Sequence, residues 1–245
     1  MDLAIEGRVA LVTGASKGLG LAVASALARE GAKLAISSRS RERVQAAAER
    51  IGARGFVHDA SEAHAVDQLV SQVEAEVGPI DILVANSGGP PPPRDLLSPE
   101  PAQWHAAHEM LLVGQLALIG AVVPGMRARR WGRVLSLSSS VVREPNPKLV
   151  LSSSYRGALL AALKTIAREV ASDAVTVNTL LTGVIATDRA REMGVDSPES
   201  ISSIPMGRVG TVEEFGATAA FLCSEPAAYI TGTALLIDGG ANRAV

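Results

Sequence analysis

A glycine-rich segment near the start of the chain has the residue types and spacing of a diphosphate-binding loop. It runs from Thr13 to Gly20 with the sequence TGASKGLG, between the apolar stretch Val9–Val12 and a stretch of helical periodicity, Leu19–Glu30. Glycines allow a sharp turn and a close approach to a ligand, and the free N–H groups at the start of the helix favour an anion. The alternative is a tight strand-to-helix turn whose small residues serve packing alone.

Strand and helix patterns alternate along the chain and must position this loop. The expected strands cover residues 9–12, 33–37, 55–58, 80–85, 133–137, 175–180 and 235–238. The expected helices cover residues 19–30, 41–50, 63–77, 103–129, 150–172 and 211–223; the fourth is broken or bent near Pro124, and Thr211 caps the last. This order predicts an α/β fold: one Rossmann-type, doubly wound domain over residues 1–245, with a mainly parallel seven-stranded sheet covered by helices on both faces.

Composition and charge exclude several classes of partner. The 245 residues are 47% hydrophobic with a formal net charge of −2, so charge gives no reason to expect binding to nucleic acid or to an anionic membrane surface. We expect no signal peptide and no stretch that approaches transmembrane length. The single cysteine, Cys223, lies in an apolar helical run and cannot form an internal disulfide, which fits a reducing cytoplasm.

Further motifs follow the expected strands. The glycine spacing is G-x-x-x-G-x-G after a threonine, Asp59 follows the third strand, and Ala85-Asn86-Ser87-Gly88 ends the fourth. A later segment reads Thr182-Gly183-Val184-Ile185-Ala186-Thr187. Together these motifs resemble the short-chain dehydrogenase/reductase family, and within it the 3-oxoacyl-(acyl carrier protein) reductases, over almost the whole chain. The resemblance implies that a nicotinamide cofactor oxidises or reduces a small-molecule substrate.

The resemblance also implies which residues hold the cofactor. They lie in the glycine loop, at the ends of the second, third and fourth strands, on the helix 150–172 and after the sixth strand. These positions are Gly14, Ser16, Lys17, Gly18, Leu19, Gly20, Ser38, Arg39, Asp59, Ala60, Asn86, Ser87, Gly88, Arg156, Gly183, Ile185 and Thr187.

Charge at the end of the second strand favours NADP(H) over NAD(H). A carboxylate at this place binds the free ribose hydroxyls of NAD and repels a 2′-phosphate. Ser38 stands there instead, Arg39 follows it, and Lys17 can point to the same spot. An arginine suits phosphate because its planar fork bonds two oxygens at once. The alternative is that Arg39 is a solvated loop charge.

The family's reaction uses a tyrosine that transfers a proton, a lysine four residues later and a serine thirteen residues before the tyrosine. Ser139, flanked by Ser138 and Ser140, stands at the serine position. Two independent counts, one from Ser139 and one from the later part of the helix 150–172, put Ser152 at the tyrosine position and Arg156 at the lysine position. Of these three catalytic residue types, this chain keeps only the serine.

These replacements change the available chemistry. A phenol has a pKa of about 10, which a nearby cation can lower, whereas a serine hydroxyl is a far weaker acid. Leu111 also replaces an asparagine that holds a relay water in the family. Arg156 is no proton shuttle, but it can hold the ribose, stabilise an alkoxide or orient a water. Tyr155, roughly 60° around the helix from Ser152, could supply the proton instead; the alternative is a tyrosine packed at a helix or subunit interface.

Other polar residues give weaker signals. His105 and His108 could share a metal, but no third ligand is evident at a useful spacing, so we expect none. A stiff loop at residues 88–93 should lie at the ligand edge, and residues 188–206 should form a short lid over the substrate.

Three functions are compatible with these residues. The favoured one is an NADP(H)-dependent oxidoreductase of a carbonyl or alcohol substrate with an atypical active site. The second is a catalytically inactive nucleotide-binding sensor or scaffold of the same fold, and the third is another reaction in the same cleft, such as dehydration or isomerisation. The apolar helices 103–129 and 150–172, together with the family resemblance, suggest a homotetramer or a dimer.

Overall fold

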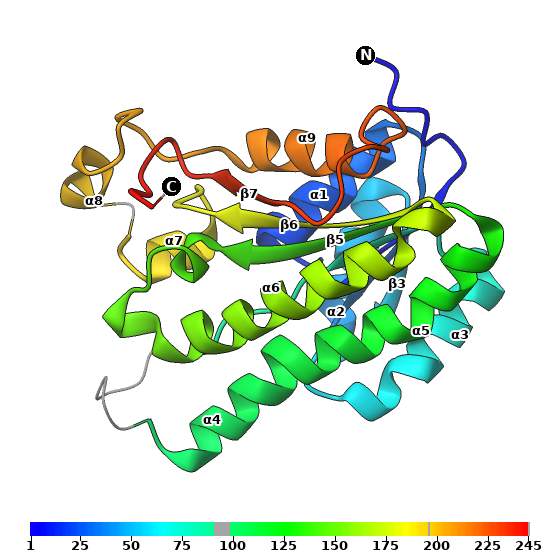
Figure 1. The fold of residues 1–245 in the computed structure, drawn as a ribbon, viewed down its shortest axis with the longest axis horizontal. Coiled ribbons are helices and arrows are strands. Elements are labelled where there is room, and N and C mark those ends of the chain that lie inside the picture. The colour runs from blue at the N-terminus through cyan, green and yellow to red at the C-terminus, as the bar shows by residue number, and fades with distance from the viewer. Residues whose placement is uncertain (91–98, 196, 245) are drawn as a thin grey trace.

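A parallel β-sheet forms the centre of the molecule in the computed structural model, which describes residues 1–90, 99–195 and 197–244. Seven strands follow the order β3-β2-β1-β4-β5-β6-β7, and every neighbouring pair is parallel (Figure 1). The strands are β1 Val9–Val12, β2 Lys33–Ser38, β3 Arg54–Val57, β4 Ile82–Ala85, β5 Gly132–Ser139, β6 Val175–Thr182 and β7 Ala234–Ile237. The predicted doubly wound α/β fold is confirmed.

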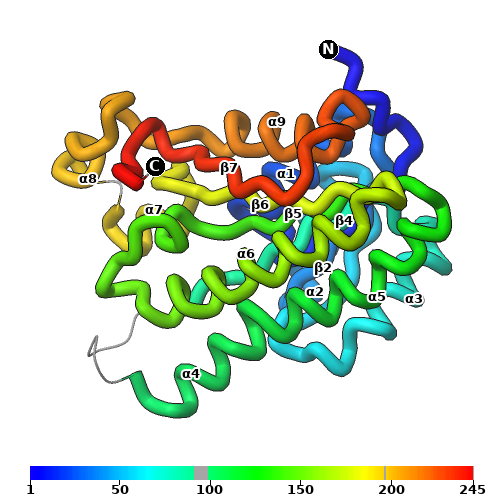
Figure 2. Tube along the Cα trace, in the orientation of Figure 1, coloured from blue at the N-terminus to red at the C-terminus, as the bar shows by residue number. Residues whose placement is uncertain are grey.

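Helices cover both faces of the sheet. They are α1 Gly18–Arg29, α2 Arg41–Ile51, α3 Val66–Glu76, α4 Pro101–His108, α5 Gly114–Arg129, α6 Val150–Val170, α7 Asp188–Glu192, α8 Pro198–Ser202 and α9 Val212–Leu222. Helices α1, α2 and α9 pack on one face, and α3, α5 and α6 pack on the other (Figure 2). The short helices α7 and α8 lie beside the carboxyl ends of β5 and β6, within the segment predicted as a lid (Figure 1).

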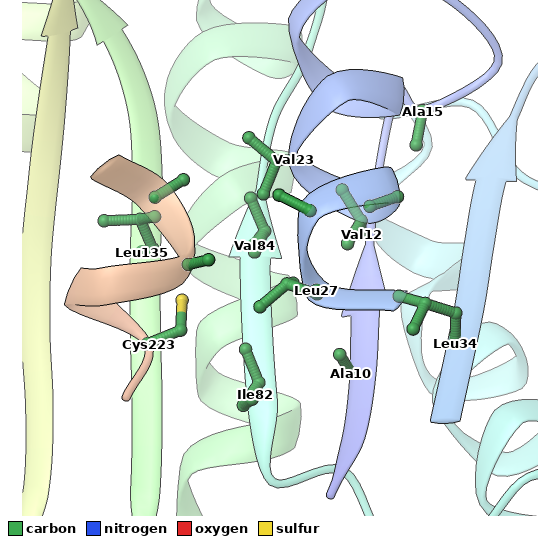
Figure 3. Close-up of a cluster of buried hydrophobic side chains, with 14 of the residues drawn as sticks. Ala10, Val12, Ala15, Val23, Leu27, Leu34, Ile82, Val84, Leu135 and Cys223 are labelled. Carbon is green, nitrogen blue, oxygen red and sulfur yellow. The ribbon is translucent and has the colours of Figure 1, made fainter. Parts of the chain in front are cut away.

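Two apolar clusters, one on each face, fix the sheet between these layers. On the α1 face, Val12 and Val84 of neighbouring strands pack under Val23 and Leu27, and Cys223 points its sulfur into the same cluster (Figure 3). Burial raises the pKa of the Cys223 thiol to about 12. Cys223 is therefore a buried core residue, and its thiol is inert at neutral pH.

The strand order reverses between β1 and β4. The chain moves outward from β1 to β2 and β3, then returns to place β4 on the other side of β1. In open α/β sheets, ligands bind outside the carboxyl ends of the strands at such a reversal. The glycine loop after β1 and the Asn86 segment after β4 meet at this point.

The long helix expected at residues 103–129 has no break near Pro124, and it is interrupted at a place that was not predicted. Helix α5 runs through Pro124 without a break. The irregularity is a π-helical turn, Glu109–Val113, between α4 and α5. Leu111, the residue at the family's asparagine position, is buried in this turn. A π-turn inserts one residue into the helical register, and such turns occur often at functional sites.

Other element ends differ from prediction by a few residues. The expected helix 63–77 divides into a 3₁₀ turn, Ala63–Ala65, and α3. Strands β5 and β6 each extend two residues beyond their predicted ends, to Ser139 and Thr182, which pair with each other. Thr211 is the cap of α9 as predicted.

Within the described residues, one helical stretch qualifies as membrane-spanning by length and composition alone. The run Pro101–Arg129 has 29 residues, and its most apolar window has a mean hydropathy of 1.7. The expectation that no stretch approaches transmembrane length is wrong by this measure. Of that window 44% is buried inside the molecule, and Leu118, Val122 and Met126 belong to the apolar cluster under β4 and β5. The same hydropathy is therefore explained by core packing.

Candidate active site

Thr13 and Asn86 connect the glycine loop to the end of β4. The Thr13 hydroxyl donates to the Asn86 carbonyl at 2.7 Å and accepts from the Asn86 amide at 2.9 Å. The Asn86 side-chain amide donates in turn to the carbonyls of Thr13 and Gly14, at 3.2 and 3.1 Å. Four hydrogen bonds thus hold the loop before any ligand arrives. Asn86, predicted to contact cofactor, positions the loop through these bonds.

The glycines of the loop are required for two different reasons. Gly14 and Gly18 have φ angles of +58° and +60°, which other residues rarely adopt. A Cβ on Gly14 would lie 2.8 Å from Asn86 Nδ2, and one on Gly20 would lie 2.5 Å from the Gly14 carbonyl. A Cβ on Gly18 would meet nothing within 4 Å, so the space beside it is open. The start of α1 therefore presents bare backbone to an open space, as an anion site requires.

The two cations predicted to select NADP(H) are exposed and weakly paired. Arg39 Nε lies 3.9 Å from Asp59 Oδ2, and Lys17 Nζ lies 3.9 Å from Glu192 Oε1 on α7. Exposed pairs at this separation contribute little and are readily exchanged for a better anion. Ser38, buried at the end of β2, donates to the Ser40 carbonyl, and no carboxylate stands in its place.

The Asp59–Ala60 segment lies beside the start of α5. Asp59 Oδ1 accepts from the amide and hydroxyl of Ser61, which fixes the turn after β3. Gly114 passes so close to the Ala60 carbonyl that a Cβ there would overlap it. His58 next to Asp59 is buried, and desolvation lowers the pKa of its imidazole. At neutral pH His58 is therefore uncharged.

The segment after β6 is held by β7. The Gly183 amide donates to the Ile237 carbonyl at 2.9 Å, and a Cβ on Gly183 would lie 2.5 Å from the Asp238 Cβ. Ile185 is buried, and Thr187 caps α7 by accepting from the Ala190 amide at 3.2 Å. These contacts bring the predicted residues Gly183, Ile185 and Thr187 to the carboxyl edge of the sheet.

Arg156 and Ser152 form a hydrogen-bonded pair on one side of α6. Arg156 Nε donates to Ser152 Oγ at 3.1 Å, and Nη1 donates to the Leu137 carbonyl of β5 at 3.0 Å. Nη2 reaches the Gly88 carbonyl after β4 at 3.5 Å. Burial, with a smaller contribution from the nearby charge of Arg189, lowers the pKa of Arg156 to about 10. The two positions taken from the family resemblance therefore hold a fixed cation between β5 and the segment after β4.

Ser139 is the last residue of β5 and stands opposite Thr182 of β6. Its hydroxyl accepts from the Val141 amide at 3.4 Å, and the turn after it packs against α6. Ser138 points to the opposite face, where its hydroxyl is buried without a hydrogen-bond partner among the described residues. Ser139 is half-buried at the edge of the sheet, whereas Ser138 is fully buried.

Tyr155 packs against α4. Its ring makes edge-to-face contacts with Trp104 and His108, with ring centroids 5.8 and 5.4 Å apart. This is the packing arrangement that the sequence allowed as the alternative to a catalytic role. His108 also contacts Glu109 at 3.2 Å, and the described residues contain no group of three or more potential metal ligands.

Two residues near the carboxyl edge of the sheet, Arg189 and Asn242, were not predicted from the sequence as site residues. Arg189 on α7 reaches the carbonyls of Gly89 and Pro90, at 3.5 and 3.4 Å, whereas the rest of the predicted stiff loop, residues 91–93, lies outside the described residues. Asn242, near the end of the chain, donates to the Ser140 carbonyl at 3.4 Å. Neither residue belongs to a local motif, so only its position in the fold brings it to the site.

Comparison with known proteins identifies the family of this chain. A family model described as enoyl-(acyl carrier protein) reductase matches residues 14–242. The chain is 35% identical over 240 residues to the 3-oxoacyl-(acyl-carrier-protein) reductase FabG of Escherichia coli, covering 96% of this chain and 97% of that protein. Similar solved structures include YwfH, an NADPH-dependent reductase of bacilysin biosynthesis (TM-score 0.93, 30% identity, 98% and 100% of the two chains). Another is the L-sorbose reductase of Gluconobacter frateurii with NADPH and L-sorbose (TM-score 0.90, 31% identity, all of both chains). The chain belongs to the short-chain dehydrogenase/reductase family.

Proposed function

We propose that the protein is an NADP(H)-dependent oxidoreductase that interconverts a small-molecule carbonyl and its alcohol. The observation that carries this proposal is the position of Arg156. Its guanidinium is fixed to Ser152, to the end of β5 and to the segment after β4, so a cation faces the crevice in which this fold binds its ligands.

The cradle after β1 fits a nicotinamide dinucleotide. The open space beside Gly18 and the bare start of α1 suit the diphosphate. Arg39 and Lys17, each in a long and exposed ion pair, can turn to a 2′-phosphate, and Ser38 adds no repelling carboxylate. The NADPH in the L-sorbose reductase structure supports the same choice.

The bound nicotinamide supplies the hydride, and the protein supplies position and charge. Arg156 holds the nicotinamide ribose and stabilises the negative charge that develops on the substrate oxygen. The Ser139 hydroxyl donates a hydrogen bond to the same oxygen. Ser152 is buried and accepts from Arg156 Nε, so it orients the cation and does not deliver the proton. With Tyr155 packed on α4, we assign the proton to water, with Tyr155 as the second choice.

Binding and turnover can be measured separately. We expect calorimetry to give tighter binding of NADPH than of NADH, and a panel of ketones and aldehydes to oxidise NADPH in the presence of the protein. Tighter binding of NADH would contradict the cofactor assignment. NADPH binding without oxidation across the panel would contradict the enzymatic role.

The second candidate is a sensor or scaffold that binds NADP(H) and does no chemistry. The observation in its favour is the burial of Ser152 where relatives of this family carry the proton-transferring tyrosine. This candidate predicts NADPH binding without turnover, and Arg156→Ala would then change affinity alone.

We also propose that the protein assembles into a homotetramer or a dimer in a reducing cytoplasm. A groove of about 540 Å³ lies between α5 and α6, lined mainly by apolar residues such as Leu116, Val123 and Ile166. A second copy would cover this face. Light scattering should report two or four chains, and a monomer at micromolar concentration would contradict the proposal.

A further inference from the structure

Arg156 and Arg189 approach the same short backbone segment from two elements. Arg156, on α6, reaches the Gly88 carbonyl at 3.5 Å. Arg189, on α7, reaches the next two carbonyls, of Gly89 and Pro90, at 3.5 and 3.4 Å. These contacts are long for charge-assisted hydrogen bonds, which are shorter by about half an ångström. Within the part of the chain that the structure describes, the two guanidinium groups therefore face one small region and use only part of their hydrogen-bonding capacity.

The carboxylates of the surrounding described elements have other partners. Asp188 pairs with Arg191 within α7, and Glu192 pairs with Lys17. Glu144, in the loop after β5, accepts from the Arg243 amide at 3.0 Å. Within residues 1–90, 99–195 and 197–244, neither Arg156 nor Arg189 forms an ion pair. Arg189 has no described hydrogen bond from its Nε or Nη1.

Two like charges at this edge repel each other. The charge of Arg189 is the second cause, after burial, that lowers the pKa of Arg156. An anion between the two groups would replace repulsion with two attractions in a partly water-excluded place. The same anion would connect α7 to the segment after β4 and so hold the predicted lid over the site.

We propose that Arg189 binds a carboxylate of the substrate, and that the substrate is an oxo acid whose carboxylate lies near the reacting carbonyl. This inference rests on the proposed oxidoreductase function. Arg156 then faces the carbonyl oxygen, and the planar fork of Arg189 holds the two carboxylate oxygens. In each turnover the carbonyl carbon would accept a hydride from NADPH, the C=O π bond would break, and the oxygen would take one proton from a water, whose hydroxide is neutralised by a proton from bulk solvent. The products are the hydroxy acid and NADP⁺.

Matched substrates test this assignment. Each 2-oxo acid of a series is compared with its primary amide, which has the same skeleton and no charge. We expect the acid to exceed the amide at least about tenfold in kcat/KM, as expected for a charge-assisted pair. Arg189→Met should remove this preference mainly through KM. Arg191→Met is the matched control, because Arg191 lies two residues away on the same helix and pairs with Asp188; it should keep the preference.

Calorimetry separates this inference from the proposed function. The oxo acid and its amide are each titrated into the NADPH-saturated protein, and NADPH is titrated into each variant. Equal affinity for acid and amide overturns the inference, and turnover of neutral ketones in that case leaves the proposed function intact. Weaker NADPH binding by Arg189→Met, with the acid preference unchanged, also overturns it, because Arg189 would then hold the cofactor. Acid-selective binding without oxidation of NADPH supports the carboxylate site and contradicts the enzymatic role.

Discussion

Arg156 and Ser152 lie one helical turn apart on α6, and the serine hydroxyl accepts a hydrogen bond from the arginine at 3.1 Å. Relatives of this family place a tyrosine and a lysine at the same spacing. In this chain the pair directs one cation toward β5 and the segment after β4, and our proposed function assigns the proton to another donor. We therefore expect the two residues to have unequal importance for the reaction.

Arg156→Ala should reduce turnover at least about 100-fold, and Ser152→Ala should reduce it by no more than about tenfold. The arginine carries charge that a water cannot replace, and loss of one stabilising group at a developing oxyanion costs roughly 100- to 1000-fold. Ser152→Ala leaves the Arg156 Nε–H without its partner, which lowers the free energy of unfolding by about 1–3 kcal/mol. Steady-state rates of NADPH oxidation check both variants. Equal loss in the two would mean that Ser152 transfers the proton.

Turnover should decline as the pH rises through about 10, the lowered pKa of Arg156. Below that pH the guanidinium is charged and the site is complete; above it the cation is lost. The linkage to stability has the opposite sign. The pKa is lower in the folded than in the unfolded chain, so deprotonation of this group alone increases stability as the pH rises through that range. Melting temperatures measured at each pH therefore distinguish loss of charge from unfolding.

Alanine at three glycines should separate backbone strain from ligand contact. Gly14, Gly18 and Gly52 have φ angles of +58°, +60° and +67°, so each substitution costs about 1 kcal/mol in strain. Gly14→Ala should lower the melting temperature most, because its Cβ meets Asn86. Gly18→Ala and Gly52→Ala should be alike in stability, but only Gly18→Ala should weaken NADPH binding. Equal NADPH affinity in these two variants would argue against a diphosphate beside Gly18.

Arg39→Asp should reverse the cofactor preference. The substitution removes a cation and supplies the carboxylate that binds free ribose hydroxyls, so NADPH affinity should fall at least about tenfold and NADH affinity should rise. Arg41→Asp, the same charge change two residues later at the start of α2, is the control. Dissociation constants at two salt concentrations provide the measurement. Unchanged NADPH affinity in Arg39→Asp would show that Arg39 is a solvated charge.

Glu214→Gln should destabilise the protein at pH 7 and make no difference near pH 2. Glu214 accepts from Arg208 at 2.6 Å and from the Thr211 amide at 2.8 Å, and these bonds hold its pKa at about 2. A carboxylate with a lowered folded pKa contributes stability above its ordinary pKa of 4.5 and loses it as the pH falls toward 2. Thermal melts from pH 7 to pH 2 should therefore converge for the two proteins. A constant difference would mean that packing, and not charge, is responsible.

Most of the fold could be predicted because its signals are local. Apolar runs such as Val9–Val12 mark buried strands, and Thr211 with Glu214 marks a helix start. The π-turn at Glu109–Val113 could not be predicted, since no residue type distinguishes it from α-helix and Pro124 gave a stronger but misleading signal.

Some residues of the candidate site could also be predicted from the sequence, and others could not. The family resemblance identified Ser152 and Arg156, and their contact could be predicted because residues four apart share one side of a helix. The contacts of Arg189 and Asn242 with the site could be recognised only in the folded structure, because they join segments about 100 residues apart in the chain. Spacing rules do not reach that far.

The contact of Asn242 with the Ser140 carbonyl has a practical consequence for handling the protein. The last described residues lie beside the candidate site, whereas the amino terminus lies on the far side of the molecule (Figure 1). An affinity tag or fluorescent label attached a few residues after Asn242 would start close to the turn after Ser139. Kinetic work should use an amino-terminal fusion, and a carboxyl-terminal fusion would itself be a perturbation experiment on the active site.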